Sequence, residues 1–346
     1  AVGLSTVPDW TKAPSAQTSA HFGAALVSTD VNGDGYGDVI VGAPEYDGSG
    51  VDEGRAYLYL GGKYGLETSA TWVQDPTNQD SARFGYALAV LDANGDGFTD
   101  VVVGAPYFDS DMVDEGGIWV YGGFAQGLES NASWYTSPTN MYYAHFGAAV
   151  ASVGDINSDG YNDFVVGAPD WDGQKNQEGR IYVYAGGENG VSLLHTRDPT
   201  DEAYAYFGES VGGAGDVNGD GYGDVIVGAP GADGTTSSEG IAYVYHGSAS
   251  GLSTTPDWSV EPTNDYGSDF GFSVDGAGDV NGDGFSDVVI GAPEYDDEGV
   301  AYVYLGAPSG LETSYQVRLH PNPYTNGLFG WAVASAGDVN ADGYAD

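Results

Sequence analysis

The sequence has no cysteine and only 8 lysine and arginine residues among 346. Disulfide bonds therefore cannot stabilise this chain, and metal sites built on cysteine are excluded. The 51 acidic residues give a formal net charge of −43. Such a field repels nucleic acid and anionic membrane surfaces. It suits cationic partners or neutral sugars, or simply keeps the protein in solution.

Long apolar runs and helical periodicity are also missing. No stretch approaches the roughly 18 apolar residues of a membrane-spanning helix, so we expect no membrane insertion. No window shows the 3.6-residue period of an amphipathic helix. Nucleophile motifs, phosphate-binding loops and zinc-ligand spacings do not appear, and basic residues are few. These absences predict an all-β protein that is not an enzyme.

One nine-residue pattern organises the chain. In the copy that starts at Asp216, oxygen-bearing side chains stand at positions 1, 3, 5 and 9, and Gly221 at position 6 permits a sharp turn. The pattern occurs six times, at steps of about 60 residues. A hard cation needs six to eight oxygen ligands at about 2.3–2.6 Å, and alternating acidic residues supply them. Asx-turn hairpins need no metal and are the alternative.

Six intact copies favour metal over bare turns, and Ca²⁺ over Mg²⁺, which prefers fewer protein oxygens. A β-branched run follows each loop, so each loop joins two strands. The predicted calcium ligands are Asp30, Asn32, Asp34, Asp38, Asp92, Asn94, Asp96, Asp100, Asp155, Asn157, Asp159, Asp163, Asp216, Asn218, Asp220, Asp224, Asp279, Asn281, Asp283, Asp287, Asp338, Asn340, Asp342 and Asp346.

Each repeat contains four short apolar segments bounded by glycine and proline, which predicts a four-stranded propeller blade. The second and third segments are apolar on both faces, as expected where blades cover each other. We predict one β-propeller domain, 1–346, with six or seven blades in the full ring and a truncated last repeat. The repeats lie near 21–82, 83–144, 145–205, 206–268, 269–327 and 328–346, and 1–20 is the outer strand of the closing blade.

Aromatic residues that keep step with the repeat are interpreted as packing groups. Trp10, Trp72, Trp134 and Trp258 recur in the fourth strand, and His195 stands at the same position in another copy. His195 is therefore expected to fill a packing position and not to act as a catalytic base.

Phe-Gly, the Asp-rich loop and Gly-Ala-Pro follow one another in every full repeat. Phe-Gly begins at Phe22, Phe84, Phe146, Phe207, Phe270 and Phe329, and Gly-Ala-Pro begins at Gly42, Gly104, Gly167, Gly228 and Gly291. This succession resembles the FG-GAP repeat of the integrin α-subunit β-propeller and its prokaryotic relatives. Segments similar to integrin leg domains, an inserted adhesion domain or a partner subunit are not found.

The resemblance implies five to six Ca²⁺ ions in the loops between strands one and two. It also implies that the main-chain carbonyl at position 7 is a ligand. From the residues themselves, the loop at Asp338 has its ligands but a truncated exit strand, so its occupancy is an open expectation. The resemblance further implies ligand binding on the face opposite the calcium loops. The position 7 residues are Tyr36, Phe98, Tyr161, Tyr222, Phe285 and Tyr344.

The opposite face carries the segments that vary between copies, and their aromatic and acidic residues suit a sugar or a cationic side chain. The alternative for these tyrosines is packing between blades. The candidate ligand-binding residues are Tyr107, Tyr142, Tyr143, Trp171, Tyr204, Tyr206, Tyr266, Tyr295, Asp47, Asp109, Asp172 and Asp296.

Calcium sites of modest charge fill where calcium is millimolar, so we expect a secreted or cell-surface protein. The sequence favours a calcium-stabilised module for adhesion or for binding a protein or glycan ligand. A purely structural module of a larger surface assembly and a calcium-dependent polysaccharide-acting enzyme are the alternatives.

Overall fold

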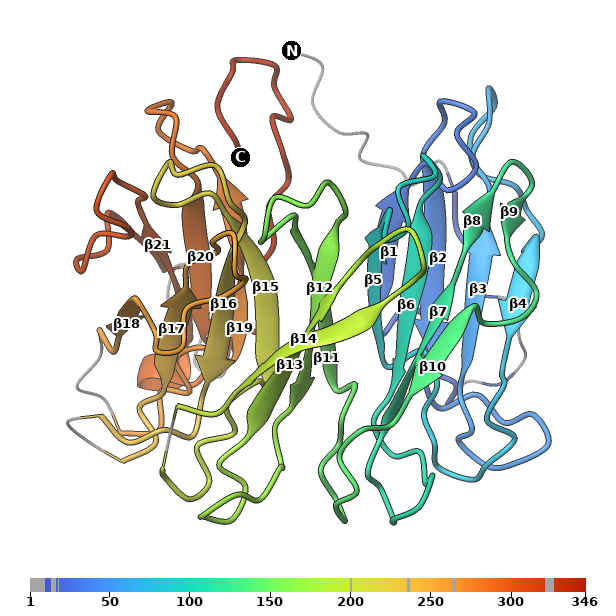
Figure 1. Cartoon of the computed structure of the whole chain (residues 1–346), viewed down its shortest axis with the longest axis horizontal. Coiled ribbons are helices and arrows are strands. Elements are labelled where there is room, and N and C mark those ends of the chain that lie inside the picture. Colours follow the sequence, from blue (N-terminus) through green and yellow to red (C-terminus); the bar gives the residue numbers. More distant parts are fainter. Residues whose placement is uncertain are drawn as a thin grey trace. The chain divides into compact units, whose positions relative to one another are not determined.

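The structure is a computed structural model that describes residues 10–13, 17, 19–199, 201–234, 237–262, 266–320 and 327–346. In this part of the chain, the strands form five four-stranded sheets and one two-stranded sheet, and one 3-10 turn spans Tyr295–Asp297 (Figure 1). This confirms the prediction of an all-β fold of four-stranded blades. Among the described residues, no helix has the length and apolar character needed to cross a membrane.

The chain divides into two compact units. The first comprises Ala1–Val150 and Gly186–Ser192, and the second comprises Ala151–Ala185 and Leu193–Asp346. The extent of a single domain over 1–346 stays a prediction. The predicted outer strand falls largely on residues 1–9, 14–16 and 18, which lie outside the described residues.

The first unit contains two of the four-stranded sheets and the two-stranded one. Their strands are β1 (Leu26–Thr29), β2 (Asp38–Ala43), β3 (Arg55–Tyr59) and β4 (Trp72–Gln74); β5 (Ala87–Leu91), β6 (Asp100–Ala105), β7 (Gly117–Tyr121) and β10 (Trp134–Thr136); and β8 (Gly123–Phe124) with β9 (Gly127–Leu128).

The other three sheets belong almost wholly to the second unit. Their strands are β11 (Ala149–Gly154), β12 (Asp163–Ala168), β13 (Arg180–Ala185) and β14 (Ser192–Arg197); β15 (Ser210–Gly215), β16 (Asp224–Ala229), β17 (Ile241–Tyr245) and β18 (Trp258–Val260); and β19 (Ser273–Gly278), β20 (Asp287–Ala292), β21 (Val300–Tyr304) and β22 (Val317–Leu319).

The central strands are apolar on both faces because each sheet packs against the next within its unit. All six residues of β6 and of β16 are buried. In the second unit, Ile226 and Val244 of one sheet share a buried cluster with Val288, Ile290 and Tyr302 of the next. Burial on both sides explains why these strands do not alternate between apolar and polar residues.

The glycines of Phe-Gly and Gly-Ala-Pro allow neighbouring backbones to touch. A Cβ on Gly42 would collide with the carbonyl oxygen of Gly85, which belongs to the next Phe-Gly. The same collision would occur between Gly228 and Gly271. Only glycine lets the second strand of one repeat approach the opening of the next this closely. The adjoining Phe84 is fully buried.

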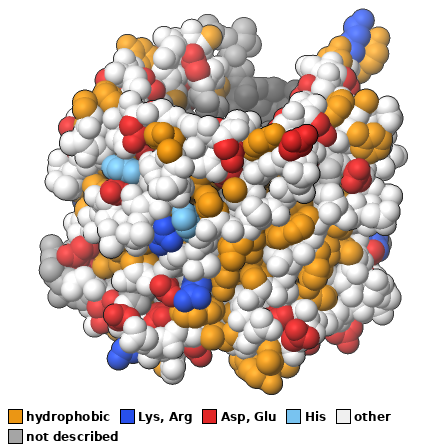
Figure 2. All heavy atoms as spheres, viewed as in Figure 1, with side chains coloured by type: hydrophobic (Ala, Val, Ile, Leu, Met, Phe, Trp, Pro, Cys, Tyr) orange, Lys and Arg blue, Asp and Glu red, His pale blue; other side chains and the backbone are white. Residues whose placement is uncertain are grey.

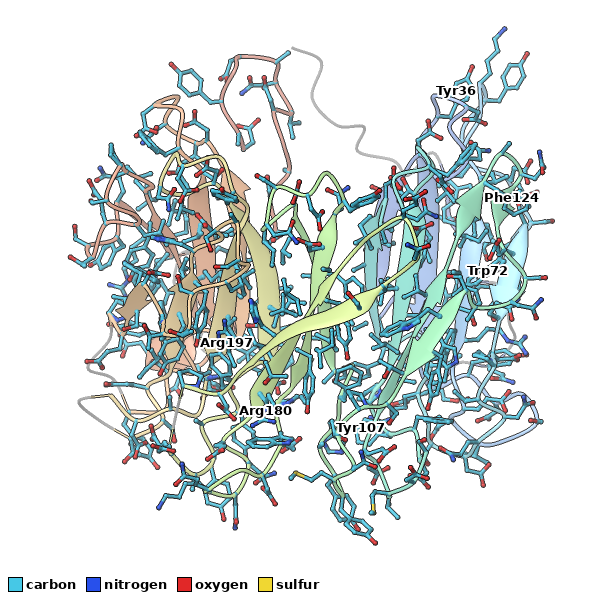
Figure 3. The ribbon with its side chains drawn as sticks, in the orientation of Figure 1. Tyr36, Trp72, Tyr107, Phe124, Arg180 and Arg197 are labelled. Carbon is cyan, nitrogen blue, oxygen red and sulfur yellow. The ribbon has the colours of Figure 1, made fainter. Side chains whose placement is uncertain are left out.

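The recurring tryptophans join successive repeats, which confirms that they are packing groups. The Trp72 ring lies 4.9 Å from that of Tyr121, and its Nε1 donates a hydrogen bond to the Glu129 carbonyl at 2.8 Å. Trp10 contacts Tyr59 in the same way, with ring centroids 5.2 Å apart. Figure 3 shows Trp72 in the first unit, at the outer strand of its sheet, and its side chain is buried.

The strand order defines two ends of every sheet. The connections from the first to the second strand and from the third to the fourth lie at one end, which we call the metal-loop end. The loop from the second to the third strand and the segment leading to the next sheet lie at the opposite end. Figure 3 shows Tyr36 at the metal-loop end and Tyr107 at the opposite end of sheets in the first unit.

Candidate metal loops and the opposite end

The first five Asp-rich loops share one internal hydrogen-bond pattern. In the first loop, the N–H of Asp34 donates to side-chain oxygens of both Asp30 and Asn32 at 3.1 Å. The N–H of Gly35 donates to the second carboxylate oxygen of Asp30 at 2.8 Å, and the N–H of Tyr36 donates to Asp34 at 2.9 Å. Two side-chain oxygens that share one N–H must lie close together. The loop therefore gathers the side chains at positions 1, 3 and 5.

The same contacts recur in the second to fifth copies, and the last copy keeps those that Asp338 and Asp342 accept. The N–H groups of Asp342 and Gly343 donate to the carboxylate of Asp338 at 3.0 and 2.8 Å. The sixth loop, which ends at Asp346, thus keeps the common shape around positions 1 and 5.

The carboxylate at position 9 has a different setting. Asp224 is fully buried, and its two oxygens accept bonds from the N–H groups of Val217 and Gly247, each at 2.9 Å. Asp38 makes the same pair of bonds with Val31 and Gly61. This side chain ties the loop to the connection between the third and fourth strands. Burial raises the pKa of Asp224 to about 6 despite both hydrogen bonds.

In the part of the chain that the structure describes, no three His, Cys, Asp or Glu side chains gather closely enough to form a metal site. Each loop instead collects two carboxylates and one amide oxygen, and holds its third carboxylate at the base of the loop. The donors are hard oxygen atoms without nitrogen or sulfur, which fits Ca²⁺ chemistry better than that of a transition metal.

The aromatic residue at position 7 packs on the preceding loop. A Cβ on Gly33 would lie 3.5 Å from the Phe98 ring, and a Cβ on Gly219 would lie 2.6 Å from the Phe285 ring. The small residue at position 4 leaves room for the ring. Neighbouring loops within a unit therefore support each other through a glycine and an aromatic side chain.

At the opposite end, the aspartates of the second-to-third strand loops brace the backbone. Asp47 accepts a bond from the N–H of Asp52 at 2.9 Å, and Asp109 accepts one from Asp114 at 2.7 Å. Asp172 repeats this contact with the N–H of Gln177 at 2.6 Å. These three carboxylates have the same structural task in each copy. Asp296 is exposed, in the 3-10 turn.

Two of the candidate aromatic residues are packing groups of the repeat. The Arg180 guanidinium lies 3.4 Å from the Trp171 ring centroid and also pairs with Asp198. Arg318 lies 4.5 Å from the Tyr295 ring in the fifth repeat. Both aromatic residues stand two places after Gly-Ala-Pro. Figure 3 shows Arg180 at the opposite end of its sheet.

Four candidate tyrosines are more than half exposed. They are Tyr142 at 55%, Tyr143 at 56%, Tyr204 at 52% and Tyr266 at 77%. The rings of Tyr142 and Tyr143 lie 6.3 Å apart. Tyr107 is enclosed between Arg83 and His145, and Tyr206 is half-buried.

His195, at the tryptophan position of the third repeat, places its Nε2 3.0 Å from the Ser250 carbonyl oxygen. This contact with the next repeat confirms its interpretation as a packing group. Two residues later, Arg197 donates to the carbonyl oxygens of Leu252 and Ser253, and Figure 3 shows it within the second unit. Sequence reasoning missed this second contribution, because arginine at that place occurs in one repeat alone.

The charge on the surface reflects the excess of acidic over basic residues in the sequence. On the face shown in Figure 2, acidic side chains are scattered widely and lysine and arginine are few. Several arginines are already paired, as Arg55 is with Asp75. The exposed charge is therefore mostly negative.

Comparison with known proteins shows where this pattern recurs. The FG-GAP repeat matches this sequence five times, over more than half of the chain. The matched segments are 22–59, 84–121, 146–184, 207–245 and 270–304. They coincide with the segment from Phe-Gly to the end of the third strand in each complete sheet.

Three relatives illustrate the range of similar proteins. Integrin alpha-4 of Xenopus laevis is 32% identical over 199 residues, which cover 56% of this chain and 18% of that protein. Integrin alpha-5 of Xenopus laevis is 30% identical over 256 residues, covering 71% of this chain and 23% of the relative. Phosphatidylinositol-glycan-specific phospholipase D of Homo sapiens is 34% identical over 209 residues, covering 56% and 25%. The chain thus spans a quarter or less of these relatives.

Proposed function

The chain belongs to the FG-GAP repeat family, and on that basis we propose that it is a calcium-stabilised β-propeller module that binds a ligand through the opposite end of its sheets. The observation that carries this proposal is the contrast between the two ends. The metal-loop end repeats the same contacts in the first five copies. The opposite end exposes Tyr142, Tyr143, Tyr204 and Tyr266, at positions where other repeats carry Asp80, Ser81 or Gly267.

Each loop would hold one Ca²⁺ through its side chains at positions 1, 3 and 5, and the carboxylate at position 9 would close the site from below. The main-chain carbonyl at position 7 would complete the ligand set. Without metal, the carboxylates of one loop repel each other in a small volume. Bound Ca²⁺ removes that repulsion and stabilises the loop that precedes the second strand.

Thermal melting tests whether bound calcium stabilises the folded protein. A ligand that binds only the folded state contributes about 2.7 kcal/mol per site at a hundredfold excess over Kd. We expect EGTA to lower the melting temperature markedly and added Ca²⁺ to restore it, with five to six ions bound by equilibrium dialysis. A melting curve that is the same in EGTA and in Ca²⁺ at low ionic strength would contradict the calcium sites.

Ligand binding is tested by screening protein and glycan arrays with the calcium-loaded protein. We expect the double variant Tyr142→Ser, Tyr143→Ser to lose hits that the wild type shows. Tyr64→Ser is the matched control, because Tyr64 is 95% exposed and lies between β3 and β4 at the metal-loop end. Hits that all three proteins bind equally would leave a structural role as the better account.

The similarity to integrin alpha subunits favours a protein ligand, a cell-surface or secreted location and assembly into a larger protein or complex. One relative is named as a phospholipase D, and this chain covers 25% of it. That partial match assigns no reaction to these residues, and we propose a binding role without catalysis. A purely structural module is the alternative, and the array experiment distinguishes the two.

A further inference from the structure

The connection between β9 and β10, in the first unit, carries an asparagine that the other repeats lack. Asn131-Ala132-Ser133 is the only Asn-x-Ser/Thr triplet in the sequence. At the same distance from the preceding Gly-Leu, the first, fourth and fifth repeats have Ser69, Thr255 and Ser314. Such a triplet is an acceptor for N-linked glycosylation in an exported chain. A triplet that arose by chance would not be accompanied by other features specific to this repeat.

The backbone on both sides of Asn131 is held, whereas its side chain is exposed. Gln74 Nε2 donates a hydrogen bond to the Ser130 carbonyl oxygen at 2.9 Å, and the N–H of Ser133 donates one to the Val120 carbonyl oxygen at 2.8 Å. The side-chain amide of Asn131 makes no hydrogen bond with the described residues. A sugar attached to this amide would therefore displace no contact of the fold, and it would project from a fixed point.

A hairpin that occurs in this repeat alone stands beside Asn131. In the part of the chain that the structure describes, β8 and β9 are the only strands that pair within a connection from a third to a fourth strand. The hairpin exposes 37% of Phe124, at a position where the fourth and fifth repeats have Ser248 and Ala307. Figure 3 shows Phe124 toward the metal-loop end of the first unit. The repeat that has the triplet thus also has an exposed aromatic ring.

Phe124 and Asn131 belong to one hollow. Together with Glu129 and Ser130 they line a space of about 350 Å³ at the surface. The exposed phenyl ring leaves apolar area in contact with water, and the C–H face of a sugar ring can cover it. The polar side chains of Glu129 and Ser130 lie beside the ring and suit the hydroxyl groups of the same sugar. The hollow therefore combines an attachment point, an apolar wall and a polar wall.

We propose that Asn131 is an N-glycosylation site, and that the first sugar of its glycan packs in this hollow against Phe124. The site lies at the metal-loop end, away from the surface that we propose for ligand binding. This inference goes beyond the proposed function and rests on one part of it, the cell-surface or secreted location, because only an exported chain meets the transferase.

The attachment is a group transfer from a lipid-linked oligosaccharyl diphosphate. The Nδ2 of Asn131 forms a bond to the anomeric carbon of the first sugar, and the bond from that carbon to the diphosphate oxygen breaks. The lipid diphosphate leaves with the electron pair, and a base of the transferase takes one proton from the amide. In the folded protein, Ser133 Oγ donates to the Val120 carbonyl oxygen at 3.1 Å. The hydroxyl is part of the acceptor triplet, so the transfer precedes the pairing of β10 with β7.

Attachment is tested by secretion from a eukaryotic host that leaves high-mannose glycans. Peptide N-glycosidase in isotopically labelled water converts a glycosylated asparagine into a labelled aspartate, which peptide mass spectrometry detects. We expect the label at Asn131 in the wild type and in Ser133→Thr, which keeps the hydroxyl. Asn131→Gln and Ser133→Ala should carry no label. Wild-type protein that is secreted without a glycan at Asn131 would overturn the proposal.

Packing of the first sugar is tested by the rate at which an endoglycosidase cuts the native, calcium-loaded glycoprotein after that sugar. A sugar held against Phe124 presents this bond poorly, so we expect cleavage of the wild type to be about threefold to tenfold slower than that of Phe124→Ser. Tyr64→Ser removes an exposed ring from the corresponding connection of the first repeat and should be cut like the wild type. Equal rates for the wild type and Phe124→Ser would overturn the packing against Phe124.

The two proposals fail separately, because Asn131→Gln removes the glycan and leaves the opposite end unchanged. This variant should keep the array hits of the wild type. A secreted protein that has array hits but no glycan would remove this site and leave the proposed ligand binding standing. A protein that is glycosylated at Asn131 but has no array hit would support the site and count against the binding role.

Discussion

The carboxylate at position 9 of each loop has a structural task that can be separated from metal binding. Asp224 accepts bonds from the buried N–H groups of Val217 and Gly247, whereas Asp220 at position 5 is exposed and accepts one from Tyr222 at 3.1 Å. We therefore expect Asp224→Asn to destabilise the protein even without calcium. Asp220→Asn should matter only when calcium is present.

The magnitude follows from the two hydrogen bonds. Asparagine keeps one acceptor oxygen, but its amide NH₂ would face the second N–H donor. A buried donor without an acceptor costs about 1–3 kcal/mol, and the remaining bond loses its charge assistance. Burial of the charge, which raises the pKa of Asp224 to about 6, offsets part of this. We expect a net loss of about 1 kcal/mol in the free energy of unfolding.

Urea denaturation followed by tryptophan fluorescence, in EGTA and again in Ca²⁺, measures both effects. In EGTA, Asp220→Asn should stay within about 0.5 kcal/mol of the wild type, because it changes an exposed side chain and reduces repulsion with Asp216. In Ca²⁺ it should lose most of the stabilisation from its own site. Asp297→Asn, at an exposed side chain outside the loops, is the control. If Asp224→Asn matched the wild type in EGTA and resembled Asp220→Asn in Ca²⁺, position 9 would be a ligand alone, and the structural task would be refuted.

Two further predictions concern buried or partly buried carboxylates at the opposite end. Both oxygens of Glu53 accept bonds from the loop before β3, whereas one oxygen of Glu115 has no partner in the described structure. In urea denaturation, Glu53→Gln should therefore lower the free energy of unfolding by about 1–3 kcal/mol, and Glu115→Gln by less than about 1 kcal/mol. Equal losses in the two variants would contradict this prediction. Burial raises the pKa of Asp269 to about 6, so the folded state holds this proton more tightly than the unfolded state does. The associated stability is complete below about pH 4 and is lost as the pH rises through about 6. Asp269→Asn should increase the free energy of unfolding at pH 7 by about 1–3 kcal/mol. It should also flatten the pH dependence of that free energy between pH 4 and 6. A variant that is less stable than the wild type at pH 7 would show that the carboxylate has a structural partner.

The fold could be predicted from the sequence because every element recurs. Phe-Gly, the Asp-rich loop and Gly-Ala-Pro mark the same three places in each repeat, and the apolar runs between them have the length of strands. One repeat read alone would be ambiguous, since Asp, Asn and Gly form turns without metal. Recurrence also identified the fourth-strand tryptophans and His195 as packing groups.

The sequence analysis did not predict that the loop aspartates bond to the backbone, although their fixed position in the repeat indicates a structural role. Asp47, Asp109, Asp172 and Asp296 all stand three places after the proline of Gly-Ala-Pro. A residue so regular is better read as part of the fold than as part of a variable binding surface. Variation in the rest of the loop concealed this regularity, and only the backbone hydrogen bonds of the first three show what the carboxylate does. Trp171 and Tyr295, one place earlier, pack on arginines, and their role in ligand binding stays a prediction.

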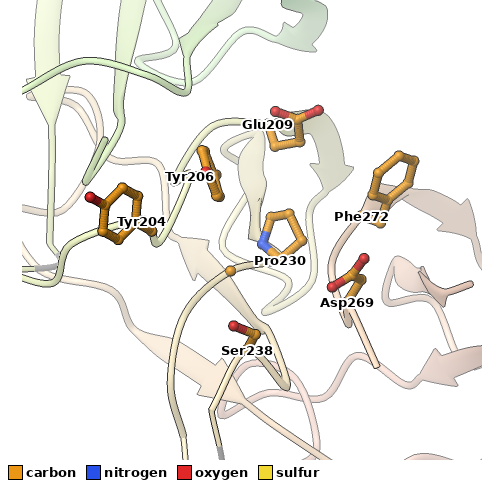
Figure 4. A pocket seen from close by; sticks show the side chains of 8 residues that line it. Tyr204, Tyr206, Glu209, Pro230, Ser238, Asp269 and Phe272 are labelled. Atoms are coloured by element: carbon orange, nitrogen blue, oxygen red, sulfur yellow. The ribbon is translucent and has the colours of Figure 1, made fainter. Parts of the chain in front are cut away.

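A cavity of about 490 Å³ in the second unit shows why a search for conspicuous residues is incomplete in a repeat protein. Exposed tyrosines attract notice, but the cavity at the opposite end of the fourth sheet is also lined by Gly231, where no side chain fits (Figure 4). Sequence alone gives no reason to single out one glycine among 57. Its meaning depends on the carbonyl oxygen of Tyr204, with which a Cβ at this position would collide. In a structure where each repeat position has a fixed packing partner, a substitution at one position changes the surface that the loops present there. Such a position is where a repeat can acquire a binding site without rebuilding its sheet.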